Sequence, residues 1–250
     1  MLKIIGMNLK IVNTGYTLFF YRHLCTIKRT SSHFLKVSEA YSGKLIQLSM
    51  DKEVPPPLVS DVALDKAMDD TIKRYKAGEF LLPDLIIRAA YTGKSRETLA
   101  DFSDDAESLV KGTVVLAAID GKDYTHWDEM VDIILKGLGY KIINLGDELS
   151  ANDILQSVNK KMPDILWLNI PSTSIPEFNV KPSTTLESEI KQVTDNISAA
   201  GLRDKISIMV GGIDGVCSNL SPVEEFDADF CCGNAIETIS YLRKIAFSTN

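Results

Sequence analysis

Two hydrophobic patterns alternate through the second half of the chain. Short continuous apolar runs, typical of strands buried on both faces, recur from Thr113 onward. Between these runs the apolar residues fall three and four positions apart, which is the spacing of one face of a helix. The pattern predicts strands at 114–119, 141–145, 165–170, 206–210 and 228–231, and helices at 127–138, 152–160, 184–200 and 234–247.

This alternation predicts a parallel sheet. A strand, a crossover helix and a second parallel strand form a right-handed unit, and the first such unit spans Thr113 to Gly146. Five strands alternating with helices predict an α/β domain with a flavodoxin-like five-stranded parallel sheet. Ligands bind such sheets at the carboxyl ends of the strands, so the polar loop 120–125 is the first place to look for chemistry.

The segment 38–111 is helical in pattern and precedes the sheet. Apolar residues share one broad face over 62–75, and a second helix begins near Pro83, where the missing N–H costs little. We expect a small bundle of about four helices over 38–111. The polar stretch 103–111 then leads into an α/β domain that occupies 112–250.

The first 37 residues form a basic extension with no acidic residue, and the first carboxylate is Glu39. Polar residues and glycines interrupt its apolar pieces, and no small-residue cleavage site follows. We expect residues 1–37 to pack poorly and to be dispensable for folding; a targeting segment is the alternative.

Composition narrows the class of function. The net charge of −7 argues against nucleic acid as a partner, because nucleic acid normally requires a basic face. No run of about 18 apolar residues exists, so no membrane span is expected. The four cysteines show no metal-ligand spacing and are interpreted as free thiols of a reducing compartment, which predicts a cytoplasmic protein.

Three stretches carry a resemblance to a known family. The helical segment contains YKAGEFLLPDL at 75–85, and the α/β segment contains GYKIINLG at 139–146 and IMVGG at 208–212. A helical bundle with this sequence, followed by a five-stranded α/β domain, resembles the corrinoid proteins of methyltransferase systems and the cobalamin module of methionine synthase. The resemblance covers about residues 38–247. It implies cobalamin as cofactor, with Phe80 and Leu81 in a helical cap over the methyl-bearing face of the corrin.

The family's lower-face motif is altered in this chain. In the family, Asp-x-His-x-x-Gly follows the first strand: the His coordinates cobalt, the Asp orients the His, and the Gly admits the nucleotide tail. The matching positions hold Lys122, Tyr124 and Trp127, and His126 lies two residues after Tyr124. The resemblance therefore implies an atypical lower axial ligand. His126 on a rearranged loop is the candidate protein ligand, and a water molecule or the cofactor's own base are the favoured alternatives.

The resemblance also implies residues around the nucleotide tail. The family's Ser-x-Leu-x-Thr motif after the third strand lines this tail, and Asn169 and Thr173 occupy its polar positions here. Gly211 and Gly212 match glycines whose missing Cβ lets the tail pack against the backbone.

Two functions follow from this resemblance. The first is a corrinoid protein that carries a cobalamin-bound methyl group between substrate-specific and acceptor methyltransferases, as a carrier rather than a free-standing catalyst. The alternative is a cofactor-free relative that acts as a binding or regulatory subunit, which Lys122, Tyr124 and Trp127 favour. An unrelated flavodoxin-like ligand binder would leave the helical cap unexplained.

Overall fold

The computed structural model describes residues 46–47, 49–51, 54–118, 125–146, 149–169, 183–211, 223–232 and 235–248. The part before the sheet contains α2 (Pro56–Leu58), the π-helical turn η1 (Val59–Leu64), α3 (Asp65–Lys76), α4 (Leu82–Ala100) and the 3₁₀ turn η2 (Ala106–Leu109). The α/β part contains β1 (Thr113–Ala118), α5 (Thr125–Leu138), β2 (Lys141–Asn144), α6 (Ala151–Lys161), β3 (Ile165–Asn169), α7 (Ser183–Ala199), η3 (Arg203–Lys205), β4 (Ser207–Gly211), η5 (Val223–Phe226), β5 (Phe230–Cys232) and α8 (Ala235–Ser248).

The five strands form one parallel sheet in the order β2-β1-β3-β4-β5. Val114 of β1 pairs with Ile142 on one side and with Ile165 on the other, so β1 lies inside the sheet. This topology confirms the predicted flavodoxin-like α/β class. The chain passes from β1 outward to β2 and then back across to β3, which creates a topological switch point between β1 and β3.

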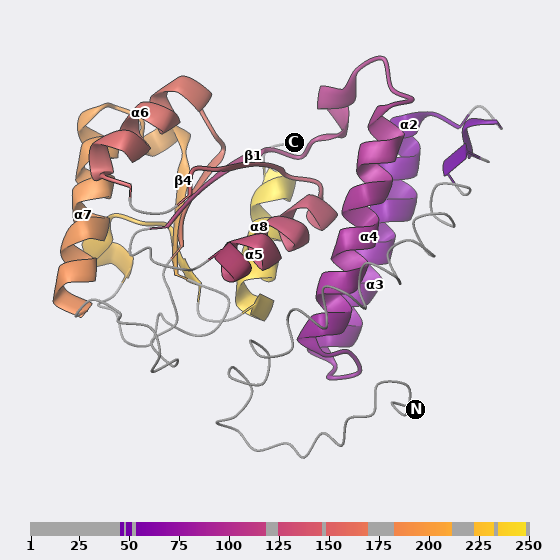
Figure 1. The fold of residues 1–250 in the computed structure, drawn as a ribbon, viewed down its shortest axis with the longest axis horizontal. Coiled ribbons are helices and arrows are strands. Elements are labelled where there is room, and N and C mark those ends of the chain that lie inside the picture. The colour runs from indigo at the N-terminus through magenta and orange to yellow at the C-terminus, as the bar shows by residue number, and fades with distance from the viewer. Residues whose placement is uncertain are drawn as a thin grey trace.

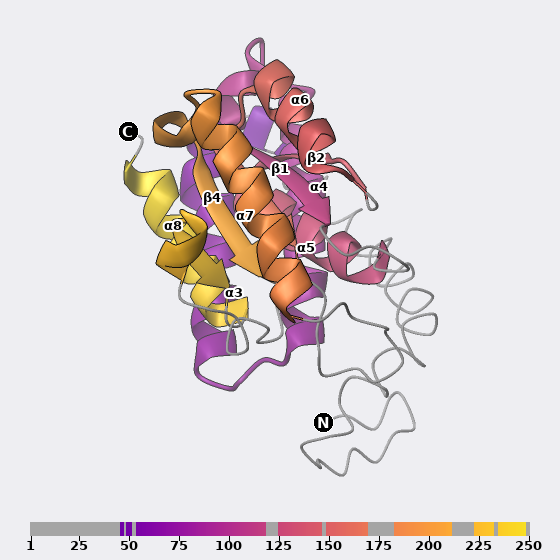
Figure 2. The same cartoon turned by 90° about the vertical axis from the view of Figure 1, so that its left-hand side faces the viewer.

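Helices cover both faces of the sheet (Figures 1 and 2). Successive strand residues point to opposite faces, so each strand contributes to two cores. On one face α5 and α8 pack against Val114, Leu116 and Trp167. On the other face α6 and α7 pack against Val115 and Leu166. The continuous apolar runs that identified the strands are therefore explained by burial on both sides.

A close helix crossing joins the α3–α4 pair to α5 (Figure 1). A Cβ added at Gly137 of α5 would lie 2.7 Å from the carbonyl oxygen and 2.8 Å from the Cα of Ala89 on α4. The crossing therefore requires glycine at position 137. Arg96 of α4 reinforces it, because its Nε donates to the Gly137 carbonyl at 3.2 Å.

Parts of the predicted organisation are not tested by these residues. Residues 1–37 lie outside the described residues, as does much of the first part of the bundle, so the domain boundaries at 37 and 111 stay predictions. The predicted linker 103–111 contains the turn η2, in which Leu109 is buried against Leu99. No helix in the described part of the chain is long and apolar enough to cross a membrane.

The cysteine prediction needs one correction. Cys232 is buried and forms no disulfide, as expected, but Cys231 is disulfide-bonded, so the expectation of four cysteines without disulfides is wrong. Cys25 and Cys217 lie outside the described residues. A disulfide requires two cysteines whose Cα atoms come within about 7 Å, a proximity that the fold creates and that spacing along the chain does not reveal. The cytoplasmic location, which rested on free thiols, stays a prediction.

Candidate functional site

The carboxyl ends of the central strands form one edge. β1 ends at Ala118, which is paired with Asn169 at the end of β3, and Leu168 of β3 is paired with Val210, one residue before the end of β4 at Gly211. The three strand ends therefore lie level with one another. They flank the switch point between β1 and β3, where sheets of this topology bind ligands.

The turn between α3 and α4 lies at the same end of the molecule as this edge (Figures 1 and 2). Near the end of α3, Lys76 donates from Nζ to Oγ of Ser240 at 2.7 Å. Ser240 lies in the second turn of α8, which begins just after the carboxyl end of β5. The predicted cap residues therefore belong to the end of the bundle nearest the edge.

Phe80 and Leu81 differ in their surroundings. The guanidinium carbons of Arg74 and Arg88 lie 5.4 and 4.4 Å from the centroid of the Phe80 ring. These three residues line a groove of about 400 Å³ between α3 and α4, on a different face of α4 from the one buried against α5. Leu81 is 50% exposed, and its backbone N–H donates to the Asp84 carboxylate at 2.9 Å. Leu81 is thus the cap candidate with the more accessible surface.

The Trp167 side chain fills the core between the sheet, α5 and α8, below the carboxyl edge of the strands. The side chain is 1% exposed, and Nε1 donates to the Gly211 carbonyl at 2.8 Å. Gly211 has φ +111°, a conformation that favours glycine. Sequence reasoning treated Trp167 as one residue of an apolar run. The available signal was its indole N–H, which needs an acceptor when buried and thus indicates a specific neighbour.

Several predicted site residues are not placed by the structure. Tyr124, Thr173 and Gly212 lie outside the described residues. His126 lies in the first turn of α5 and Asn169 ends β3, but nothing beyond these backbone positions is described for either residue. Among the described residues, no group of three or more His, Cys, Asp or Glu side chains could hold a metal ion. The cobalt ligand and the tail-lining residues stay predictions.

Sequence comparison identifies relatives of this chain. No protein-family model matches it. Trimethylamine corrinoid protein 2 of Methanosarcina mazei is 20% identical over 188 residues, which is 74% of this chain and 81% of that protein. Methionine synthase of Mycobacterium leprae is 23% identical over 172 residues, or 66% of this chain and 13% of that much longer protein. The chain is homologous to the methylamine corrinoid proteins.

Solved structures support the fold of this corrinoid-protein homologue. A cobalamin-binding protein from Desulfitobacterium hafniense superposes with a TM-score of 0.60 at 17% identity, covering 88% of this chain and 98% of that one. The methanol:cobalamin methyltransferase complex of Methanosarcina barkeri contains a chain with a TM-score of 0.65 at 22% identity, covering 86% of this chain and 77% of that one. The similarity extends beyond the sheet into the helices that precede it, since the α/β part alone is much shorter than the covered length.

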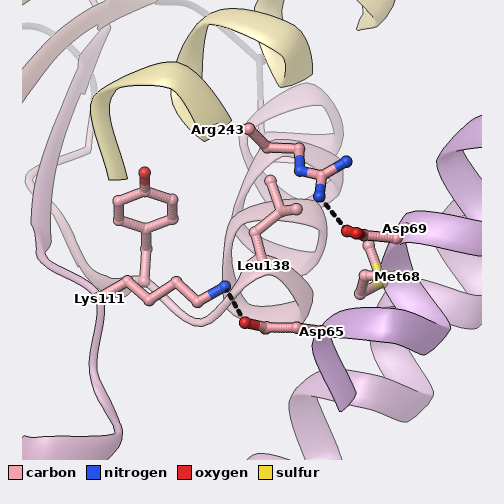
Figure 3. A pocket seen from close by; sticks show the side chains of 7 residues that line it. Asp65, Met68, Asp69, Lys111, Leu138 and Arg243 are labelled. Carbon is pink, nitrogen blue, oxygen red and sulfur yellow. Dashed lines mark hydrogen bonds and ion pairs between the residues drawn. The ribbon is translucent and has the colours of Figure 1, made fainter. Parts of the chain in front are cut away.

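In this homologue, charged side chains join the bundle to the α/β part at a distance from the strand ends. Asp65 of α3 pairs with Arg96 and with Lys111, whose Nζ lies 2.6 Å from a carboxylate oxygen. Asp69, one turn further along α3, pairs with Arg243 of α8. Figure 3 shows the Asp65–Lys111 and Asp69–Arg243 pairs beside a small pocket. Met68, Leu138 and Tyr140 also line this pocket. Because Lys111 precedes β1, these ion pairs lie toward the amino ends of the strands and hold the bundle in place.

Proposed function

We propose that this chain binds cobalamin at the strand ends and carries a methyl group between methyltransferases. The main support is the homology to corrinoid proteins over 188 residues, a length that spans part of the bundle as well as the sheet. The switch point between β1 and β3 and the α3–α4 turn at the same end are consistent with a cofactor held between them. In this proposal the chain is a carrier component, not a free-standing catalyst.

The described residues fit a corrin ring at the edge. β1 ends in Ala118 and β4 in Gly211, so two of the strand ends present small residues to a flat macrocycle. Among the described residues, a Cβ added at Gly146, just after β2, would meet nothing within 4 Å. We propose that Leu81 and Phe80 contribute to the upper side of this corrin site.

The strand ends, the cap and the loop residues would each have a specific role in holding the cofactor. Cobalamin, when bound, supplies a cobalt centre that accepts and gives up a methyl group. The strand ends support the ring, and the apolar side chain of Leu81 excludes water from its upper side. His126 or Tyr124 would supply a lower ligand; otherwise water or the cofactor's own base fills that position. Asn169, Thr173 and Gly212 are the proposed contacts for the nucleotide.

The proposed partners are a substrate-specific and an acceptor methyltransferase. A solved relative of similar fold is part of a methanol:cobalamin methyltransferase complex, which supports this type of partner. The second candidate function is a cofactor-free binding or regulatory subunit of such a system. It is favoured by two bulky residues: Trp127 stands where the family's motif has glycine, and Trp167 fills the interior below the edge.

Reconstitution tests the proposal. The full chain is mixed with hydroxocobalamin and separated by gel filtration, and the absorption spectrum of the protein peak is recorded. We expect the cofactor to elute with the protein. His126→Ala and Tyr124→Phe should leave the spectrum unchanged if water or the cofactor's base is the lower ligand, whereas a spectral change in one variant assigns that residue. A folded protein that elutes without cofactor would favour the second candidate function.

A further inference from the structure

The space between α5, β3 and α8 lies directly below the strand ends and is almost full. The free volume there is about 10 Å³, comparable to the space that a single water molecule needs. The residues around it are apolar except for one threonine: Val131, Ile134, Leu135, Trp167, Thr238, Ile239 and Leu242. The indole of Trp167 is the largest of these side chains and is buried to 1% exposure.

Contacts on several sides hold this arrangement. The indole Nε1 donates to the Gly211 carbonyl at 2.8 Å, so rotation of the ring would leave a buried donor and a buried acceptor unpaired. Tyr140, just after α5, donates from its hydroxyl to the Leu242 carbonyl of α8 at 2.6 Å. The two helices that cover Trp167 are thus tied to each other, and the indole cannot swing out without displacing one of them.

We infer that Trp167 excludes the nucleotide tail of a corrinoid from the interior, so that this chain holds its cofactor mainly by the corrin ring and leaves the tail only contacts at the surface. The inference rests on the proposed cobalamin function. Pockets for organic ligands of this size measure about 300–1,000 Å³, whereas this interior offers about 10 Å³. Burial of the tail's phosphate among apolar side chains would also leave a charge without partners. The tail therefore stays at the surface of the edge, and Trp167 is a specificity-determining residue.

Two corrinoids test this inference on the wild-type chain. Hydroxocobalamin carries the nucleotide tail, and aquocobinamide has the same ring without it. Each is titrated into the full chain, and binding is followed by absorption and by gel filtration. We expect dissociation constants that agree within about threefold, because the tail makes no buried contact. Cobalamin binding tighter by about tenfold, or ~1.4 kcal/mol, would overturn the inference.

Variants at position 167 extend the test. Trp167→Leu enlarges the interior, and we expect it to shift the preference toward hydroxocobalamin by about threefold or more, a difference of ~0.6 kcal/mol. Trp167→Phe keeps an aromatic ring in the same place and should retain the wild-type ratio. An unchanged ratio in a folded Trp167→Leu protein contradicts the role of the indole. If circular dichroism shows that Trp167→Leu does not fold, the ratio of the two dissociation constants on the wild-type chain tests the inference by itself. If neither corrinoid binds to folded wild-type chain, the proposed function itself fails, and this inference fails with it.

Discussion

Replacement of Gly137 by alanine tests whether the helix crossing holds the bundle on the α/β part. The added Cβ would lie 2.7–2.8 Å from the carbonyl oxygen, Cα and Cβ of Ala89, whereas ordinary contacts begin near 3.4 Å. The atoms in the way belong mainly to the backbone of α4, so no side-chain rotation relieves the overlap. One of the two helices must move by several tenths of an ångström, and its packing with the sheet must change with it.

Two opposing effects determine how far Gly137→Ala changes the free energy of unfolding. Overpacking of a well-packed contact costs about 1–3 kcal/mol, and we expect the upper part of that range because backbone atoms are involved. Replacement of a helical glycine by alanine returns about 1 kcal/mol through helix propensity. The net expectation is a loss of about 2 kcal/mol in the free energy of unfolding. For a chain of this size this corresponds to a fall of about 4–8 °C in the melting temperature.

Gly93 on α4 provides the matched control at the same crossing. A Cβ added there would lie 3.3 Å from the Cβ of Lys136 and 3.4 Å from the backbone nitrogen of Gly137, so only a slight adjustment is needed. Gly93→Ala should remain within about 1 kcal/mol of wild type, since the propensity gain offsets the tight contact. Urea unfolding followed by circular dichroism measures both variants. A Gly137→Ala protein as stable as wild type, or one more stable than Gly93→Ala, would refute the reasoning.

Three further predictions concern the bundle contacts, the cap and the response to pH. Arg96 is 8% exposed, donates to Ser60 and Gly137 and pairs with Asp65. Arg96→Met should therefore lower the free energy of unfolding, measured by urea titration, by about 3 kcal/mol. A loss below about 1 kcal/mol would contradict this prediction. Leu81→Ala should weaken hydroxocobalamin binding by about threefold or more, or ~0.6 kcal/mol. The control is Leu58→Ala, which should not weaken binding, although Leu58 is 52% exposed and Leu81 is 50% exposed. Equal effects of the two substitutions would argue against a cap role for Leu81. Burial raises the pKa of Cys232 to about 12 in the folded state, above its ordinary value of 9.0. The contribution of the protonated thiol to the free energy of unfolding is therefore present below pH 9 and is lost as the pH rises toward 12. Unfolding measured across this range should show a smaller loss of stability in Cys232→Ala than in wild type, and parallel curves would refute the assignment.

The order and type of the elements were predictable because they depend on local pattern. The first strand was predicted at 114–119 and lies at Thr113–Ala118, and the helix predicted at 184–200 lies at Ser183–Ala199. The last strand was predicted at 228–231 but occupies Phe230–Cys232. Asp229 accounts for its late start, because its carboxylate accepts from the Ile208 backbone N–H and pairs with Arg203. These contacts join residues 21 and 26 positions apart, which no local pattern contains.

The candidate site was predictable to a smaller degree. The sequence identified the carboxyl edge of the sheet and, through the resemblance, the corrinoid-protein relatives. Because side-chain surroundings arise from segments distant in the chain, it did not reveal that Arg74 and Arg88 enclose the Phe80 ring. The closure of the interior by Trp167 was missed for the same reason, since it depends on α5, α8 and Gly211 together.

The sequence by itself determined the α/β class, the parallel sheet and the two-part order of bundle and sheet, because hydrophobic periodicity is a property of neighbouring residues. The tertiary structure decided how the parts fit: the crossing at Gly137, the ion pairs of Asp65 and Asp69, and the disulfide at Cys231. It also decided how much space remains beneath the strand ends. Volume in a core is set by side chains from several elements packing at crystal-like density, and a one-dimensional pattern carries no information about which of them meet.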